Sequence, residues 1–286
     1  MKNLWSKKTE IEFFRESLKR VKSEDLFYKI RDRYYAYYPK GYKEKKQTIQ
    51  SRNALIGEFT ENFCKNLLRD FANQHGLYAV NKVICEKLEL TKNSPADLAL
   101  CKTPQQYQKP ENIKIIFEIK MSIVNNYEYN PETEEIKFVG DYTTHIGNPS
   151  LLRSDSMLKA IGKSLNIRIS SDYASKIPII VLGNTPITNS YLKKVDKLKE
   201  NGFIQGFWSL YPEASTNLEN SEKEGFLTIK SAEDLYLKLD TILKMDLYFV
   251  SFMLDKENLG KLIEIVSKED NLEDKANKFL KLVRGI

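Results

Sequence analysis

Apolar residues recur three or four positions apart in several stretches of the chain, which is the spacing of one helix face. The clearest stretch is 53–71, where they form a single apolar stripe. The same spacing predicts helices over 151–165 and 190–200. It also predicts that residues 1–50 and 216–286 are largely helical. The apolar positions of these two terminal regions are Ile11, Phe14, Leu18, Val21, Leu235, Leu239, Leu243, Leu259, Leu262, Ile263, Phe279, Leu282 and Val283.

Strands are predicted where short apolar runs replace the helical spacing, at 78–84, 96–101, 113–121, 177–183 and 204–210. The run at 177–183 is almost continuously apolar, which is typical of a central strand covered on both faces, with Pro178 at its start. The resulting order is a helix, three strands, a helix, a strand, a helix and a strand. It predicts an α/β fold with a mixed β-sheet flanked by helices. Helical extensions would precede and follow this core, so the expected regions are 1–52, 53–215 and 216–286.

The length and composition narrow the class of protein. The chain has 286 residues, 41% of them hydrophobic, which is enough for a substantial core. No run approaches the roughly 18 consecutive apolar residues that a membrane span needs. Residues 1–8 also lack the apolar stretch of a signal peptide. We therefore expect a soluble, cytoplasmic protein with no membrane partner.

Cysteine and histidine are scarce and lack metal-ligand spacing; they are Cys64, Cys85, Cys101, His75 and His145. This disfavours structural zinc, a disulfide framework and most histidine-based hydrolases, and it leaves carboxylates as the candidate metal ligands. His145 is interpreted as a loop residue outside any catalytic site. The net charge of +6 permits a polyanionic partner but is too small to require one.

An aromatic and basic run lies at 34–43, where tyrosines alternate with lysines. Such side chains can stack on bases and neutralise phosphates. The alternative is a helix that packs its tyrosines on the core, and this second interpretation is favoured.

The run 115–121 carries two charges inside a predicted strand. Because strand side chains alternate, Glu118, Lys120 and Ser122 share one face, while the other face is uniformly apolar. Glu118 and Lys120 are then roughly 6.6 Å apart along the strand. Charges there are costly unless they are paired, solvated or bound to metal, so this face opens into a cleft or lies on an exposed edge strand. A solvated ladder of charges across strands is the structural alternative to a catalytic site.

A second carboxylate, Asp97, lies 118 − 97 = 21 positions upstream in another predicted strand. That separation suits neighbouring strands joined by a loop. Asp97 and Glu118 are therefore expected to converge on one cation.

The sequence Pro95-Ala96-Asp97 followed by Glu118-Ile119-Lys120 resembles the signature of the PD-(D/E)xK nuclease superfamily. One residue is inserted between the proline and the aspartate, whereas the E-x-K half fits without departure. The resemblance spans residues 53–211 and implies a restriction-endonuclease-like core with the element order given above.

Many members of the superfamily also carry a glutamate in a G-x-x-x-E pattern on the first helix, and Gly57 to Glu61 matches it. Glu58, one turn away, is the alternative. At 100° per residue, Glu61 lies nearer the edge of the apolar stripe, so it is better placed to reach a cleft.

The resemblance implies a type II restriction endonuclease that hydrolyses double-stranded DNA at a short specific sequence. Asp97 and Glu118 would hold Mg²⁺, as one or two ions, and Glu61 would bind a second ion or its water shell. Lys120 would orient or help to deprotonate the attacking water. The alternatives are a repair or resolvase nuclease of the same superfamily and a non-catalytic DNA-binding protein of the same fold.

Candidates for DNA recognition lie in the insertion 127–149 and at the start of the helix that follows. Arg153 and Lys159 would contact phosphates or guanine edges, and Asp155 would accept from cytosine. An ordinary helix with a solvated face explains this segment equally well. The full candidate set is Arg153, Ser154, Asp155, Ser156 and Lys159.

The partners follow from the same resemblance. A palindromic target requires two copies of a single-site chain, so we expect a homodimer, with the C-terminal helices as one candidate interface. A cognate DNA methyltransferase would be a functional partner rather than a bound one.

Overall fold

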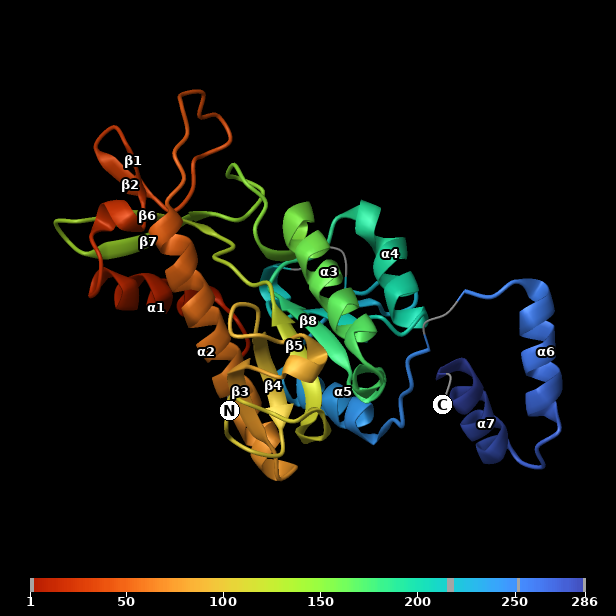
Figure 1. Ribbon diagram of the computed structural model, residues 1–286. Coiled ribbons are helices and arrows are strands. Elements are labelled where there is room, and N and C mark those ends of the chain that lie inside the picture. The colour runs from red at the N-terminus through yellow and green to blue at the C-terminus, as the bar shows by residue number, and fades with distance from the viewer. Residues whose placement is uncertain (1–2, 215–218, 251–252, 285–286) are drawn as a thin grey trace.

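A six-stranded sheet forms the centre of the computed structural model, which describes residues 3–214, 219–250 and 253–284 (Figure 1). Its order is β10-β9-β8-β5-β4-β3. The strands β3, β4 and β5 are antiparallel neighbours, whereas β5, β8, β9 and β10 run parallel. Their bounds are Tyr78–Val83 (β3), Ala96–Cys101 (β4), Ile113–Ile119 (β5), Ile179–Gly183 (β8), Gly206–Ser209 (β9) and Phe226–Thr228 (β10). The predicted α/β fold with a mixed sheet is confirmed.

Helices cover both faces of this sheet, which is why its central strands are almost continuously apolar. α2 and α5 pack on the face that carries Ile115 and Phe117. α3 and α4 pack on the opposite face, against residues such as Ile116 and Val181. The helices are α2 (Gln50–Gln74), α3 (Ser154–Ser170), α4 (Asn189–Glu200) and α5 (Ala232–Lys244).

A second, four-stranded antiparallel sheet joins two segments far apart in the sequence (Figure 1). It combines β1 (Tyr28–Ile30) and β2 (Arg33–Tyr35) with β6 (Asn126–Asn130) and β7 (Glu135–Gly140). The expectation of a helical N-terminal region is therefore wrong after α1 (Lys7–Leu18), and so is that of a helix over 34–43. The segment around Tyr34 is a strand because Tyr34 pairs with Tyr129 of β6. The spacing of apolar residues near Tyr34 cannot reveal a partner that lies about a hundred positions away.

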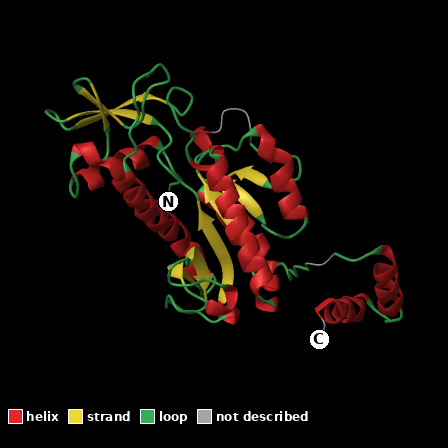
Figure 2. Ribbon diagram, turned by 45° about the horizontal axis from the view of Figure 1, so that its top comes forward, coloured by secondary structure: helices red, strands yellow, loops and turns green. Residues whose placement is uncertain are grey.

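The region after 215 is only partly a helical extension. β10 is the last strand of the main sheet, and α5 packs on the core of that sheet. The expected boundary at 215/216 therefore falls inside the core rather than at its end. α6 (Lys256–Ser267) and α7 (Leu272–Arg284) are helical as predicted and lie apart from the sheets in both views (Figures 1 and 2). No residue of α6 is buried, and Leu259, Ile263 and Leu272 are exposed.

A buried carboxylate connects the two sheets. Glu10 of α1 is fully buried and accepts five hydrogen bonds, from Trp5 Nε1, Val124 N, Asn125 N, Asn125 Nδ2 and Tyr127 Oη, at 2.6–3.2 Å. Burial raises the pKa of Glu10, and the bonds from Val124, Trp5, Asn125 and Tyr127 oppose this by stabilising the anion. The carboxylate thereby fixes the chain between β5 and β6.

Replacing Glu10 by glutamine should destabilise the protein by about 2–3 kcal/mol, because a side-chain NH₂ would face donors that now bond a carboxylate. Urea unfolding measures the loss. Glu12→Gln on the same helix is the matched control, since Glu12 is exposed and its replacement should change the unfolding free energy little. Equal stability of both variants would contradict the structural role of Glu10.

Candidate functional site

Asp97 and Glu118 are brought together by the antiparallel pairing of β4 with β5. Leu98 lies opposite Phe117 in the register. At the next position, a side chain replaces the backbone as the hydrogen-bond partner of β5: Asp97 Oδ2 accepts a hydrogen bond from Ile119 N at 2.7 Å. Asp97 thus caps the end of β5, beside the Glu118 carboxylate.

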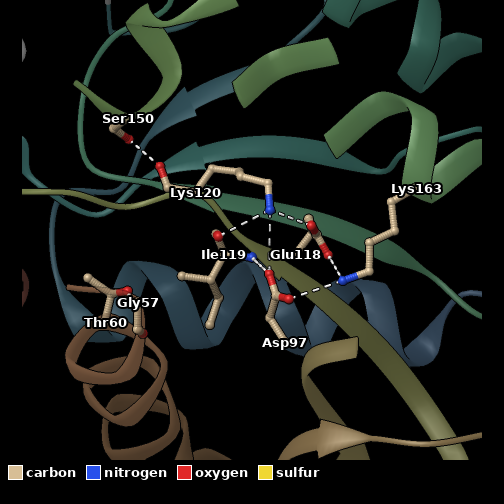
Figure 3. Close-up of polar contacts among 8 residues, drawn as sticks. All are labelled: Gly57, Thr60, Asp97, Glu118, Ile119, Lys120, Ser150 and Lys163. Atoms are coloured by element: carbon tan, nitrogen blue, oxygen red, sulfur yellow. Dashed lines mark hydrogen bonds and ion pairs between the residues drawn. The ribbon is translucent and has the colours of Figure 1, made fainter. Parts of the chain in front are cut away.

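Lys120 follows directly after β5 and is fixed by its backbone. Its N–H donates to the carbonyl of Leu182 on β8 at 2.7 Å, and its carbonyl accepts from Ser150 Oγ at 2.6 Å. Its ammonium group bonds the Glu118 carboxylate and lies 3.7 Å from Asp97 Oδ2. The predicted convergence of Asp97, Glu118 and Lys120 is thus present in the structure (Figure 3).

A fourth charged residue, Lys163 of α3, completes the cluster. Its Nζ lies 3.0 Å from Asp97 Oδ1 and 2.7 Å from Glu118 Oε2 (Figure 3). Lysine is an ordinary helix residue, so its presence in a predicted helix does not mark Lys163 as a site residue. One signal was present: Lys163 lies three positions after Ala160 and four before Ile167, so the buried face of α3 contains a lysine.

These four side chains form a largely enclosed cluster of opposite charges. The side chain of Glu118 is 5% exposed, and those of Asp97, Lys120 and Lys163 are 19–21% exposed. Burial, and then the neighbouring Asp97 charge, raise the pKa of Glu118, while Lys120 and Lys163 oppose the shift. Burial would lower the pKa of Lys163, but Asp97 and Glu118 outweigh it and raise that pKa. The site therefore contains two carboxylates whose negative charges are balanced by two lysine ammonium groups.

The structure separates the two helix glutamates. Glu61 of α2 is half-buried, and its pKa is raised by burial and then by the charge of Asp97. Glu58 instead forms an ion pair with Arg20 at 3.6 Å and lines a groove between α1 and α2. Of the two glutamates, Glu61 is therefore the one whose pKa is affected by the charges of the cluster.

The five candidate DNA-contacting residues fall into two groups. Asp155 forms ion pairs with Arg153 at 3.5 Å and with Lys159 at 3.0 Å, and all three side chains are largely exposed. Neither Asp155 nor Lys159 lines a pocket that contains the site residues. A pocket of about 500 Å³ that includes Lys120 is lined on the helix side by Arg153, Ser154 and Ser156.

The donors suit a hard divalent cation. Asp97 and Glu118 offer carboxylate oxygens, and the Ile119 carbonyl oxygen lies 3.5 Å from the same Lys120 ammonium group. The ammonium of Lys163 bonds both carboxylates, so a cation already occupies the position between them. Within the described residues, no group of three or more His, Cys, Asp or Glu side chains is arranged to hold a metal ion.

No family model, curated protein or solved structure matches the chain. Among the described helices, none is both long and apolar enough to cross a membrane.

Lys163→Gln should lower the unfolding free energy by about 1–2 kcal/mol, because Asp97 and Glu118 then share a single lysine. Denaturant unfolding in EDTA measures this loss. Lys159→Gln, one helical turn away and paired only at the surface, is the control and should have little effect. If the two substitutions cost the same, Lys163 does not stabilise the carboxylate pair.

Proposed function

We propose that this protein is a divalent-metal-dependent endonuclease that hydrolyses double-stranded DNA at a short specific sequence, as a type II restriction enzyme does. The observation that carries the proposal is the convergence of Asp97, Glu118 and Lys120 from two paired strands. The resemblance of these residues to the PD-(D/E)xK signature supports it. Lys120 also lines a pocket that has no lining carboxylate, which suits an anionic substrate.

Hydrolysis of a phosphodiester requires water to attack phosphorus in line with the leaving 3′ oxygen. The P–O3′ bond breaks, and the products are a 5′-phosphate and a 3′-hydroxyl. Bound Mg²⁺ would supply charge stabilisation to the phosphoryl group during this step. Asp97 and Glu118 are the residues that would hold it, and Glu61 would bind its water shell or a second ion.

Lys120 would act on the attacking water and the phosphate. Its ammonium group is held by Glu118 and lies near Asp97, so its charge is directed at the carboxylate pair. Its backbone is fixed by Leu182 and Ser150. We assign it to orienting the water and offsetting charge on the phosphate.

The partners are part of the same proposal. A homodimer would present two sites to a palindromic duplex. Exposed apolar residues of α6 and α7, including Ile263 and Leu272, are the candidate contact surface. A cognate DNA methyltransferase would protect the same sequence without binding to this chain.

One observation favours a second candidate, a non-catalytic DNA-binding protein. Lys163 bonds both carboxylates, as it would in a purely structural charge cluster. A repair or resolvase nuclease would share the metal site and differ only in the DNA that it accepts. The cleavage products distinguish all three.

Asp97→Asn and Glu118→Gln should each abolish Mg²⁺-dependent cleavage while leaving DNA binding largely intact, because each removes one negative metal ligand and keeps its shape. The assay digests long unmodified DNA with Mg²⁺ and sequences the ends. Discrete fragments that share a short symmetric terminus support the proposal. Structure-dependent or random nicking favours the repair nuclease, and the absence of cleavage with any divalent metal favours the non-catalytic protein.

Glu61→Gln should lower cleavage about 10- to 100-fold at subsaturating Mg²⁺, since a half-buried carboxylate beside Asp97 supports the ion and its water shell. Glu58→Gln, on the same helix but paired with Arg20, is the control and should retain activity. Single-turnover rates over a Mg²⁺ titration make the comparison. The reverse order of effects would transfer the role to Glu58.

A further inference from the structure

The pocket beside Lys120 is built from five separate segments. Tyr37, the beginning of α2, residues 119–122, residues 147–150 and the beginning of α3 enclose about 500 Å³. Its charged lining residues are Arg52, Lys120 and Arg153, and no aspartate or glutamate lines it. The hydroxyls of Ser154 and Ser156 and the amides of Asn53 and Asn148 add donors, whereas the lining hydroxyls of Ser122 and Ser150 donate to the carbonyls of Ile123 and Lys120. The lining is therefore complementary to an anion.

Arg52 is a buried cation in this wall. It is 5% exposed, its guanidinium lies over the rings of Tyr28 and Tyr37, and one amino group donates to the carbonyl of Leu26 at 2.9 Å. Its Nε is buried without a hydrogen-bond partner. Within the part of the chain that the structure describes, no carboxylate forms an ion pair with Arg52. Neutral carbonyl groups and aromatic rings therefore surround this charge, and none of these partners carries a compensating negative charge.

The N-terminus of α3 faces the same pocket. This helix has 17 residues, its N-cap position is Arg153, and no side chain caps its first N–H groups. Ser154 and Ser156, in the first turn, both line the pocket. Unsatisfied N–H groups and the helix dipole make such a terminus attractive to phosphate.

We propose that this pocket holds a backbone phosphate of the DNA substrate, close to the phosphate that is hydrolysed at Asp97 and Glu118. This inference rests on the proposed nuclease function. It assigns Arg153, Ser154 and Ser156 to the sugar-phosphate backbone rather than to base edges. Contacts of this kind position the duplex and contribute equally on every sequence.

Arg52 is a poor residue for testing the assignment, because it also holds the carbonyl groups of Leu26 and Ala36 and its replacement would damage the fold. Ser154→Asp is the better variant. An aspartate in the first turn suits the helix dipole, so folding is retained, while its charge repels a phosphate in the pocket. Asn189→Asp introduces the same charge at the exposed first residue of α4 and serves as the matched control.

The experiment measures binding of a short unrelated-sequence duplex to the full chain in EDTA, so that no cleavage occurs, over a range of salt concentrations. We expect Ser154→Asp to weaken binding about tenfold and to reduce the slope of log K against log salt by about 1. Asn189→Asp should bind like the unmodified protein. Unchanged binding by Ser154→Asp, equal weakening by both variants, or no binding of duplex by the unmodified protein would overturn the inference.

A titration with inorganic phosphate separates the source of the anion. Phosphate should displace the duplex from the unmodified protein more readily than chloride of equal ionic strength. If phosphate binds at the pocket but Ser154→Asp leaves duplex binding unchanged, the site serves a free anion and the DNA assignment fails. Duplex binding is measured without metal, so the result on the pocket can be interpreted even if the nuclease assay fails. If Ser154→Asp cleaves and binds DNA as the unmodified protein does, the phosphate pocket is rejected and the nuclease proposal is not.

Discussion

Two carboxylates held side by side at the end of β5 set the main constraint on this structure. Asp97 is tied to Glu118 through the register of β4 and β5 and through its bond to Ile119 N. Neither negative charge can be enclosed in this way without compensating positive charge. Lys120 supplies it from the position directly after β5, and Lys163 supplies it from the helix that covers this face, so the position of α3 over the sheet and the charge balance of the site depend on each other.

A second buried carboxylate extends this arrangement to the other sheet. Glu10 holds the chain after β5 by bonding the N–H groups of Val124 and Asn125. That chain leads from Lys120 to β6, and its Ser122 hydroxyl accepts from Ser150 N at 3.0 Å. The four-stranded sheet is thus attached to the same connection that carries Lys120, and residues 119–122 of this connection line the pocket.

The proposed chemistry depends on how Lys163 and a metal would share the carboxylate pair. Both are cations, and the bonds of Lys163 to Asp97 and Glu118 occupy the oxygens that an ion would take. A divalent ion has twice the charge of an ammonium group and takes six or more oxygen ligands, so its entry would move Lys163 away from the pair. In a solely structural cluster Lys163 would stay, and metal would change neither the stability nor the activity of the protein.

The sequence alone determined much of the main sheet and three of the four cluster residues. Apolar spacing located β3, β4, β5, β8, β9 and the helices between them, and strand alternation put Glu118 and Lys120 on one face, because these patterns are local consequences of backbone geometry. Only the tertiary structure decided which distant segments meet. It paired the N-terminal hairpin with β6, brought Lys163 to the carboxylates, and assembled the pocket that Arg52 lines. Each of these depends on contacts across tens of positions, where the pattern of neighbouring residues carries no record of the partner.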